Sequence, residues 1–172
     1  MVIREQFQVR ASRQAVWDFF MDVQKVAACM PGVQSVEPIG DNTYRVVISV
    51  KVGPIKADFS GQVAVIDPHP PTSFRVTADW KDRNTASKTQ VAAGVELEEL
   101  PDGTVTCRLK ADVAILGVLG KYGQGIAEKK AAEIREAFSA CLRAALEPAP
   151  VTMPAVASAP AASGKPYLKD GE

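Results

Sequence analysis

The chain has 172 residues, of which 47% are hydrophobic and 23% are charged, and these are the proportions of an ordinary globular domain. Its 20 basic and 20 acidic residues give a formal net charge of zero, and no basic run contains interleaved aromatic residues, which argues against nucleic-acid binding. No apolar run approaches the ~18 residues that a membrane-spanning helix needs. We expect one domain that is large enough to bury a core.

The N-terminal part predicts one strand followed by two short helices. Alternation over residues 2–10 is typical of a half-buried strand and not of a signal peptide. Glu5 lies on the apolar phase of this strand, and its place near the N-terminus predicts a side chain in solvent. Ser12 and Asp22 are good N-caps for the two helices, and Pro31-Gly32 ends the second one.

Six further strands follow, each indicated by alternating apolar residues between turn signals. The longest begins near Thr43, and a turn at Gly53-Pro54 leads to a strand in which Gly61 would let the chain bend. A strong turn signal at Pro101-Asp102-Gly103 separates the last two strands. Together these patterns predict one curved, mostly antiparallel sheet.

The last periodic stretch, residues 117–146, predicts a long helix. Its apolar residues recur at three- and four-residue steps, and no proline occurs between Val118 and Leu146. Such a helix would be about 43 Å long, and it needs a surface of matching length to bury its stripe. The glycines at 117, 120, 123 and 125 leave two interpretations open, an end that can move or an end that packs closely.

The cysteines indicate the compartment, and the composition of the C-terminal residues indicates where the folded domain ends. Cys29, Cys107 and Cys141 have no CxxC spacing and lie near apolar phases, which predicts buried thiols in a reducing compartment, the cytoplasm. From Glu147 onward, proline and alanine dominate. We therefore predict a folded domain over residues 1–147 and a disordered tail over residues 148–172.

Recognisable catalytic and metal-binding motifs are missing from the sequence. His69, the only histidine, lies between prolines without a cysteine or carboxylate partner at ligand spacing. A catalytic triad with histidine would therefore have to use this residue. No phosphate-binding GxxxxGK[ST] motif occurs either. The sequence predicts no catalytic residue, no metal site and no resident cofactor.

Three motifs carry a family resemblance. They are Cys29-Met30-Pro31-Gly32, Lys51-Val52-Gly53-Pro54-Ile55-Lys56-Ala57-Asp58-Phe59-Ser60-Gly61, and Leu116-Gly117-Val118-Leu119-Gly120. With the order of elements over residues 2–146, they resemble the carbon monoxide dehydrogenase CoxG family, which belongs to the START/SRPBCC superfamily. The resemblance implies an α+β helix-grip fold, in which a seven-stranded curved antiparallel sheet wraps around a long C-terminal helix, with two short helices after the first strand.

The resemblance also implies a function. It points to a non-enzymatic accessory protein of a molybdenum hydroxylase, similar to CO dehydrogenase, that carries an isoprenoid quinone or a similar lipid. The tail would then make a peripheral membrane or protein contact, at the inner face of the membrane. Two alternatives remain: an assembly or maturation factor for the hydroxylase, and a small-molecule lyase or cyclase that uses the cavity.

A sheet that curves around a helix without closing fully leaves room for a ligand between them. Lys130 falls inside the apolar stripe of the helix, so its ammonium either pairs with a ligand carbonyl or carboxylate or reaches water above a packed stem. Thr85, Ser87 and Thr89 either donate to a ligand head group or lie where the sheet leaves the core. The predicted cavity-lining residues are Val46, Ile48, Phe59, Phe74, Val76, Trp80, Thr89, Val91, Leu109, Val113, Leu119, Ile126, Lys130 and Ile134.

Overall fold

The structure of the chain, a computed structural model, describes residues 1–148. The elements are β1 (Val2–Val9), α1 (Arg13–Met21), α2 (Val23–Cys29), β2 (Val33–Gly40), β3 (Thr43–Val52), β4 (Ile55–His69), β5 (Ser73–Asp82), β6 (Lys88–Glu99), β7 (Val105–Leu116), the 3-10 helix η1 (Val118–Tyr122) and α3 (Gly123–Leu146). Apart from Pro148, the tail predicted over residues 148–172 lies outside the described residues, so that prediction stays untested.

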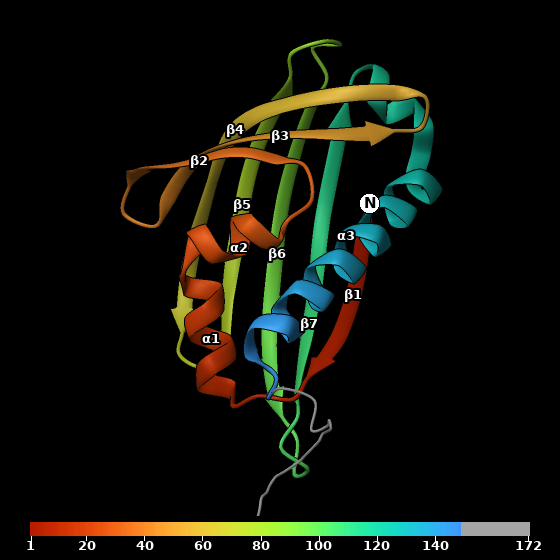
Figure 1. Ribbon diagram of the computed structural model, residues 1–172. Helices are drawn as coiled ribbons and strands as arrows, with labels where there is room; N and C mark the ends of the chain where they lie inside the picture. Colours follow the sequence, from red (N-terminus) through yellow and green to blue (C-terminus); the bar gives the residue numbers. More distant parts are fainter. Residues whose placement is uncertain (149–172) are drawn as a thin grey trace, which may run out of the picture.

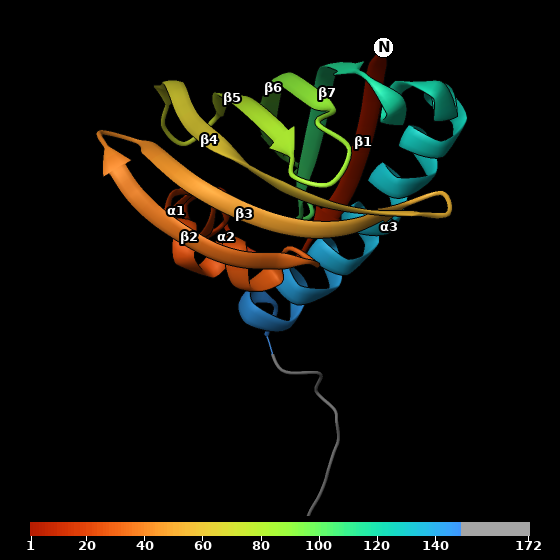
Figure 2. The same cartoon turned by 90° about the horizontal axis from the view of Figure 1, so that it is seen from above.

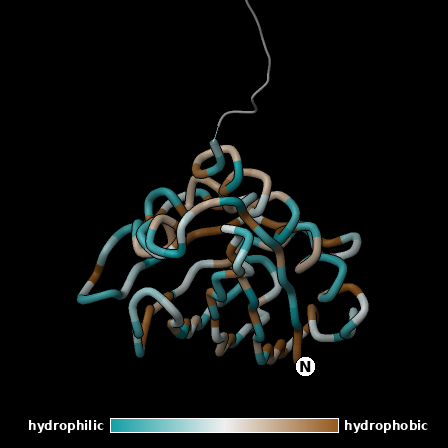
Figure 3. The backbone as a smooth tube through the Cα atoms, turned by 90° about the horizontal axis from the view of Figure 1, so that it is seen from below, coloured by the Kyte–Doolittle hydropathy of each residue, from teal (hydrophilic) through white to brown (hydrophobic). Residues whose placement is uncertain are grey.

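All seven strands form one antiparallel sheet in the order β1-β7-β6-β5-β4-β3-β2. The sheet curves, and the three α-helices lie on its one concave side (Figures 1 and 2). Apolar and polar residues alternate along the strands, as a sheet with one buried face requires (Figure 3). The predicted helix-grip architecture is confirmed, including the two short helices after β1.

The two short helices begin where the sequence predicts. The Ser12 hydroxyl accepts a hydrogen bond from the amide of Ala15 at 3.1 Å, and the Asp22 carboxylate accepts one from the amide of Lys25 at 3.3 Å. Each cap satisfies an amide that the first turn of a helix leaves without a partner.

The C-terminal helix differs from the prediction at its start. A single helix from residue 117 was expected, but a 3-10 turn precedes α3, which begins at Gly123 and is about 36 Å long. Gly123 has φ +76°, in the left-handed region that favours glycine, and this interrupts the helical path. Gly120 lies so close to the Ile115 carbonyl that a Cβ would come within 2.7 Å of its oxygen, so here a glycine serves close packing.

One end of the space between sheet and helices is tightly packed. Val16, Val105 and Leu142 are fully buried there, at the end where α1, α2 and the last turns of α3 meet the sheet. The ring of Phe138 on α3 stacks against aromatic rings of β1 and α1, with centroids 5.6–6.3 Å from its own. This cluster anchors α3 to the sheet.

Cys29 and Cys141 form a disulfide that joins the end of α2 to α3, with Cα atoms 5.5 Å apart. The prediction of buried free thiols is therefore wrong for these two residues, because periodicity places each on an apolar phase but cannot show that the two phases meet. Cys107 is a buried free thiol, and burial raises its pKa to about 12, so it stays protonated at neutral pH. Because two of the three cysteines are bonded to each other, the cysteines no longer support the predicted reducing compartment.

Candidate functional site

The predicted lining residues from the strands lie on one face of the sheet, the face that carries α3. The registers place Trp80 beside Thr89, and Val91 beside Val113. On the next pair of strands, Ile48 of β3 lies beside Phe59 of β4. The sequence pattern therefore selects side chains that the fold does bring together.

This face has a packed half and an open half. Val46, Phe74 and Leu119 are buried, with 8%, 4% and 2% of their surface exposed, and Val76 and Leu109 pack against the core cluster. Other predicted residues keep part of their surface accessible although they point inward. We call them the open half: Ile48, Phe59, Trp80, Thr89, Val91, Val113, Ile126 and Lys130.

The partial exposure of these inward-facing apolar side chains indicates that they are incompletely packed. In a filled core these side chains would be buried, as Val105 and Leu142 are at the other end. The helices therefore cover this part of the inner face less completely than they cover the core end. Ile134, farther along α3, is also half-buried.

Aromatic side chains shape the open half. The rings of Phe59 and Trp80 meet edge to face, with centroids 6.5 Å apart. At Gly53, in the β3–β4 turn, a Cβ would lie 3.3 Å from the ring of Tyr122 and 3.8 Å from Ile126, so this turn closes over the start of α3. The open half is thus bounded by the β3–β4 turn at one end and the packed core at the other.

Lys130 directs its charge to its own helix. Its Nζ donates a hydrogen bond to Oε1 of Glu133 at 3.0 Å, and the lysine side chain is 30% exposed. This hydrogen bond, reinforced by the lysine charge, lowers the pKa of Glu133. The arrangement agrees with a packed stem whose head reaches the surface, so a role for Lys130 in ligand binding remains a hypothesis.

Two of the three candidate hydroxyls belong to a structural cluster in the β5–β6 turn. The amide and hydroxyl of Thr85 both donate to the fully buried Asp82 carboxylate, and the amide of Asp58 donates to it at 2.7 Å. Ser87 accepts a hydrogen bond from the amide of Leu119 at 3.1 Å. Only Thr89 of the three lies within β6 and faces the open half.

The Asp82 carboxylate stays ionised despite its position. Burial raises its pKa, but the hydrogen bonds from the Thr85 hydroxyl and from the backbone amides of Asp58 and Thr85 outweigh this effect and hold the pKa below its usual value. The Asp82 carboxylate therefore holds its own turn through Thr85 and joins this turn to β4 through the amide of Asp58.

The predicted environment of Glu5 is wrong. It was expected in solvent, but its carboxylate forms an ion pair with Arg135 of α3, with side chains 19% and 28% exposed, respectively. Alternation assigned Glu5 to the inner face correctly. What the sequence could not show is that α3 brings an arginine to that point.

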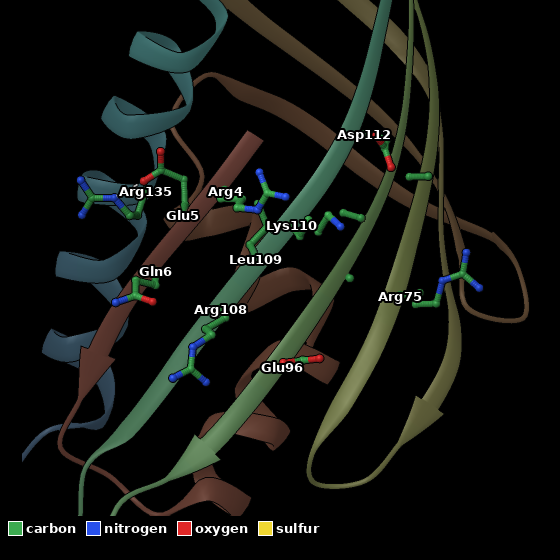
Figure 4. A pocket seen from close by; sticks show the side chains of 13 residues that line it. Arg4, Glu5, Gln6, Arg75, Glu96, Arg108, Leu109, Lys110, Asp112 and Arg135 are labelled. Carbon is green, nitrogen blue, oxygen red and sulfur yellow. Dashed lines mark hydrogen bonds and ion pairs between the residues drawn. The ribbon is translucent and has the colours of Figure 1, made fainter. Parts of the chain in front are cut away.

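A second candidate region lies mainly on the opposite face of the sheet, and at the edge strand β1 it reaches Glu5 and Arg135. An open trough of about 980 Å³ crosses β1, β7, β6 and β5 (Figure 4). Its lining residues are Arg4, Glu5, Gln6, Arg75, Ala92, Ala93, Gly94, Glu96, Arg108, Leu109, Lys110, Asp112 and Arg135. Sequence reasoning missed this trough, because the polar phase of a strand reads as an ordinary solvated face.

The trough contains two cations without partners. Arg75 and Arg108 pair with carboxylates at 2.9 and 2.7 Å, but Arg4 and Lys110 make no ion pair among the described residues. The register places Arg4 and Lys110 directly opposite each other on β1 and β7, an arrangement of like charges that is unfavourable for a sheet. Only this pairing, which the sequence does not specify, would have revealed the site.

Residues 1–148 show neither a group of metal ligands nor a membrane-spanning helix. No three histidine, cysteine, aspartate or glutamate side chains of this part of the chain are grouped as metal ligands would be. Within the same residues, no helix combines the length and apolar character needed to cross a bilayer.

Solved structures define the class of fold. A conserved protein from Geobacillus kaustophilus matches with a TM-score of 0.76 and 16% identity, over 83% of this chain and 92% of its own. A START superfamily protein from Mycobacterium smegmatis matches with a TM-score of 0.61 and 14% identity, over 85% and 97% of the two chains. The Zhui aromatase/cyclase from Streptomyces sp. R1128 matches with a TM-score of 0.56 and 17% identity, over 84% and 90%. At these identities the matches show a START-like helix-grip fold.

The family follows from the sequence itself. The family model for the CoxG subunit of carbon monoxide dehydrogenase matches residues 6–147, which is most of the chain. The chain belongs to this family. No curated protein matches it closely enough to count as a relative.

Proposed function

We propose that this protein is a non-enzymatic carrier that holds an isoprenoid quinone, or a similar lipid, between the sheet and α3 and presents it to a molybdenum hydroxylase of the CO dehydrogenase type. The observation that carries this proposal is the open half, where inward-facing apolar side chains are only partly covered. Membership of the CoxG family supports an accessory role beside such an enzyme.

The physical basis is the insolubility of the ligand. Removing apolar surface from water stabilises a complex by about 25 cal/mol per Å², so an isoprenoid chain gains from contact with Trp80, Val91 and Val113. Thr89 offers a hydroxyl to a quinone carbonyl from the same face. The eight residues of the open half include two polar side chains, Thr89 and Lys130, and the ammonium of Lys130 is bound by Glu133. This composition supports binding over acid–base catalysis of the lyase or cyclase kind.

Native mass spectrometry of the protein purified from its source, before and after lipid extraction, tests the proposal. We expect a bound isoprenoid mass that disappears on extraction and returns when quinone is added. An empty protein that co-purifies with the enzyme would overturn the carrier function. We place the protein at the inner face of the membrane, where such quinones dissolve, and the proposed contact of the tail falls on residues outside the described part of the chain.

The outer trough favours a second candidate, an assembly or maturation factor for the hydroxylase. In this case the outer surface matters, and the unpaired Arg4 and Lys110 would receive carboxylates of the enzyme. An Arg4→Gln/Lys110→Gln variant should then lose the enzyme in co-purification while it still binds quinone. If it retains the enzyme, the trough is not the docking site.

A further inference from the structure

Positive charge is concentrated at one end of the molecule. We call this the basic end: residues 51–56 of the β3–β4 turn, residues 81–88 of the β5–β6 turn, and residues 116–121 at the start of η1. Its exposed basic residues are Lys51, Lys56, Lys81, Arg83, Lys88 and Lys121. Its one carboxylate, Asp82, is fully buried, although the whole chain has a formal net charge of zero.

The three segments lie side by side. The registers join Lys81 to Lys88, and Lys88 to Leu116. The Asn84 side chain donates a hydrogen bond to the Lys56 carbonyl at 3.2 Å, which ties the β5–β6 turn to the β3–β4 turn. Figure 1 shows the two turns and η1 gathered at the top of the molecule, and Figure 2 looks down on this end.

The arrangement of these charges works against the stability of the fold. Lys51 lies directly opposite Lys56, and Lys81 directly opposite Lys88, and like charges in such positions repel. None of the six basic residues makes an ion pair within residues 1–148. Asp58, the nearest partly exposed carboxylate, already accepts hydrogen bonds from Ser49 and Asn84. These hydrogen bonds lower the pKa of Asp58, and the charges of Lys56 and Arg83 lower it further, so Asp58 relieves part of the repulsion. The positive charge that remains points to an external anion.

Exposed aliphatic side chains lie within the same end. Leu116 is 59% exposed and Val118 is 40% exposed, which makes them the two most exposed large hydrophobic residues of the described chain. Five of the six basic residues are lysines, which protein–protein interfaces disfavour, and the basic end exposes no aromatic anchor. Lysines around protruding aliphatic side chains are instead typical of contact with an anionic bilayer.

We propose that the basic end docks the protein on an anionic lipid surface, with Leu116 and Val118 entering the boundary between head groups and acyl chains. The inference rests on the membrane contact in the proposed function and deepens it, because it assigns that contact to the folded domain and names its lipid class. Tyr122 and Ile126 pack beside Gly53 of the same end, so a docked molecule holds the start of α3, and the open half next to it, near the bilayer.

Sedimentation of the full chain with vesicles tests the docking. We expect binding to phosphatidylcholine vesicles that contain phosphatidylglycerol, loss of binding in high salt, and little binding to phosphatidylcholine alone. Each lysine near an anionic surface contributes about a fivefold factor, so Lys51→Gln/Lys56→Gln/Lys81→Gln/Lys88→Gln should weaken binding at least about 100-fold. The matched control is Arg10→Gln/Lys25→Gln/Arg45→Gln/Lys129→Gln, which removes equal charge from exposed positions outside the basic end and should bind like the wild type.

A second pair of measurements locates the contact. Leu116→Ser/Val118→Ser should weaken vesicle binding about tenfold, because two aliphatic side chains that would insert partly into the bilayer are lost. Hydrogen exchange in the presence of anionic vesicles should protect residues 51–56, 81–88 and 116–121. Equal binding by the two four-residue glutamine variants would overturn the inference and leave the tail as the contact. Protection of the basic end by the purified hydroxylase but not by vesicles would overturn it in favour of an acidic protein partner.

The two proposals fail separately. Quinone binding in solution does not require vesicles, so a protein that binds quinone but no anionic vesicle contradicts the docking inference alone. A protein that binds anionic vesicles through the basic end but carries no isoprenoid contradicts the carrier function alone.

Discussion

Arg135 in the middle of α3 forms an ion pair with Glu5 of the edge strand β1, and both side chains are largely buried. The Nε of Arg143 donates to the Gln8 carbonyl of the same strand at 2.9 Å. These contacts hold α3 along the β1 edge of the sheet (Figure 1), while the sheet continues past it through β7 to β2. The short helices α1 and α2 and the last turns of α3 fill one end of the inward face, and only the start of α3 lies over the other end.

Removal of Arg135 should therefore loosen α3. Because Glu5 would lose its partner in a largely buried place, we expect Arg135→Met to lower the free energy of unfolding by about 1–3 kcal/mol. Urea unfolding followed by circular dichroism measures this. Arg75→Met is the matched control, because the Arg75–Asp67 pair is 57% exposed on both sides, and its loss should cost below about 1 kcal/mol. Equal costs would show that Arg135 does not hold α3.

The disulfide predicts a defined thiol count. Denatured, unreduced protein should titrate one thiol per chain, Cys107, and three after reduction. Because Cys29 and Cys141 are 112 residues apart, reduction should lower the free energy of unfolding by about 2–4 kcal/mol. Three thiols before reduction would show that the bond does not form in the protein as isolated.

The buried Asp82 predicts a dependence of stability on pH. Its pKa is lowered in the folded state, so its stabilising contribution is fully present above the unfolded value of about 3.9 and is lost as the pH falls below it. Asp82→Asn should cost about 1–3 kcal/mol near neutral pH, and the difference from the wild type should shrink at about pH 3. Urea unfolding at both pH values measures it, with the exposed Asp41→Asn as control. A difference that does not change with pH would contradict the charged state of Asp82.

The two tryptophans report on the ligand site separately. Trp80 belongs to the open half, whereas Trp17 is 5% exposed within the packed core. A bound quinone should quench the fluorescence of Trp80, because it would lie against that indole ring. We expect Trp80→Phe to lose most of the quenching in a quinone titration and Trp17→Phe to retain it. Quenching that depends on Trp17 would place the ligand elsewhere.

The element order could be predicted because local patterns specify it. Alternation, the Ser12 and Asp22 caps and the Gly53-Pro54 turn act within a few residues, and the structure has all of them. The predicted start of α3 was wrong. Apolar periodicity continues through the 3-10 turn, and it does not reveal the left-handed backbone at Gly123 that separates this turn from α3.

Contacts between distant segments could not be predicted. The Cys29–Cys141 bond, the Glu5–Arg135 pair and the opposition of Arg4 and Lys110 depend on register and helix placement, which no single segment encodes. The basic end likewise appears only when three segments that are far apart in the sequence meet, the β3–β4 turn, the β5–β6 turn and the start of η1. Strand phase placed the predicted lining residues of the strands on one face, as the registers show, but their role in ligand binding stays a prediction, and phase does not show which of them the core covers.

We propose that a hydrophobic ligand binds between the sheet and the start of α3. Isothermal titration of a short-chain quinone into wild type and Val91→Phe tests it most directly, with Ala92→Phe, exposed on the other face of the same strand, as the matched control. If the claim holds, the wild type and Ala92→Phe bind alike, and Val91→Phe binds at least about tenfold more weakly, because one larger side chain fills the site. Equal affinity of all three proteins, with the fold of each intact, would contradict it.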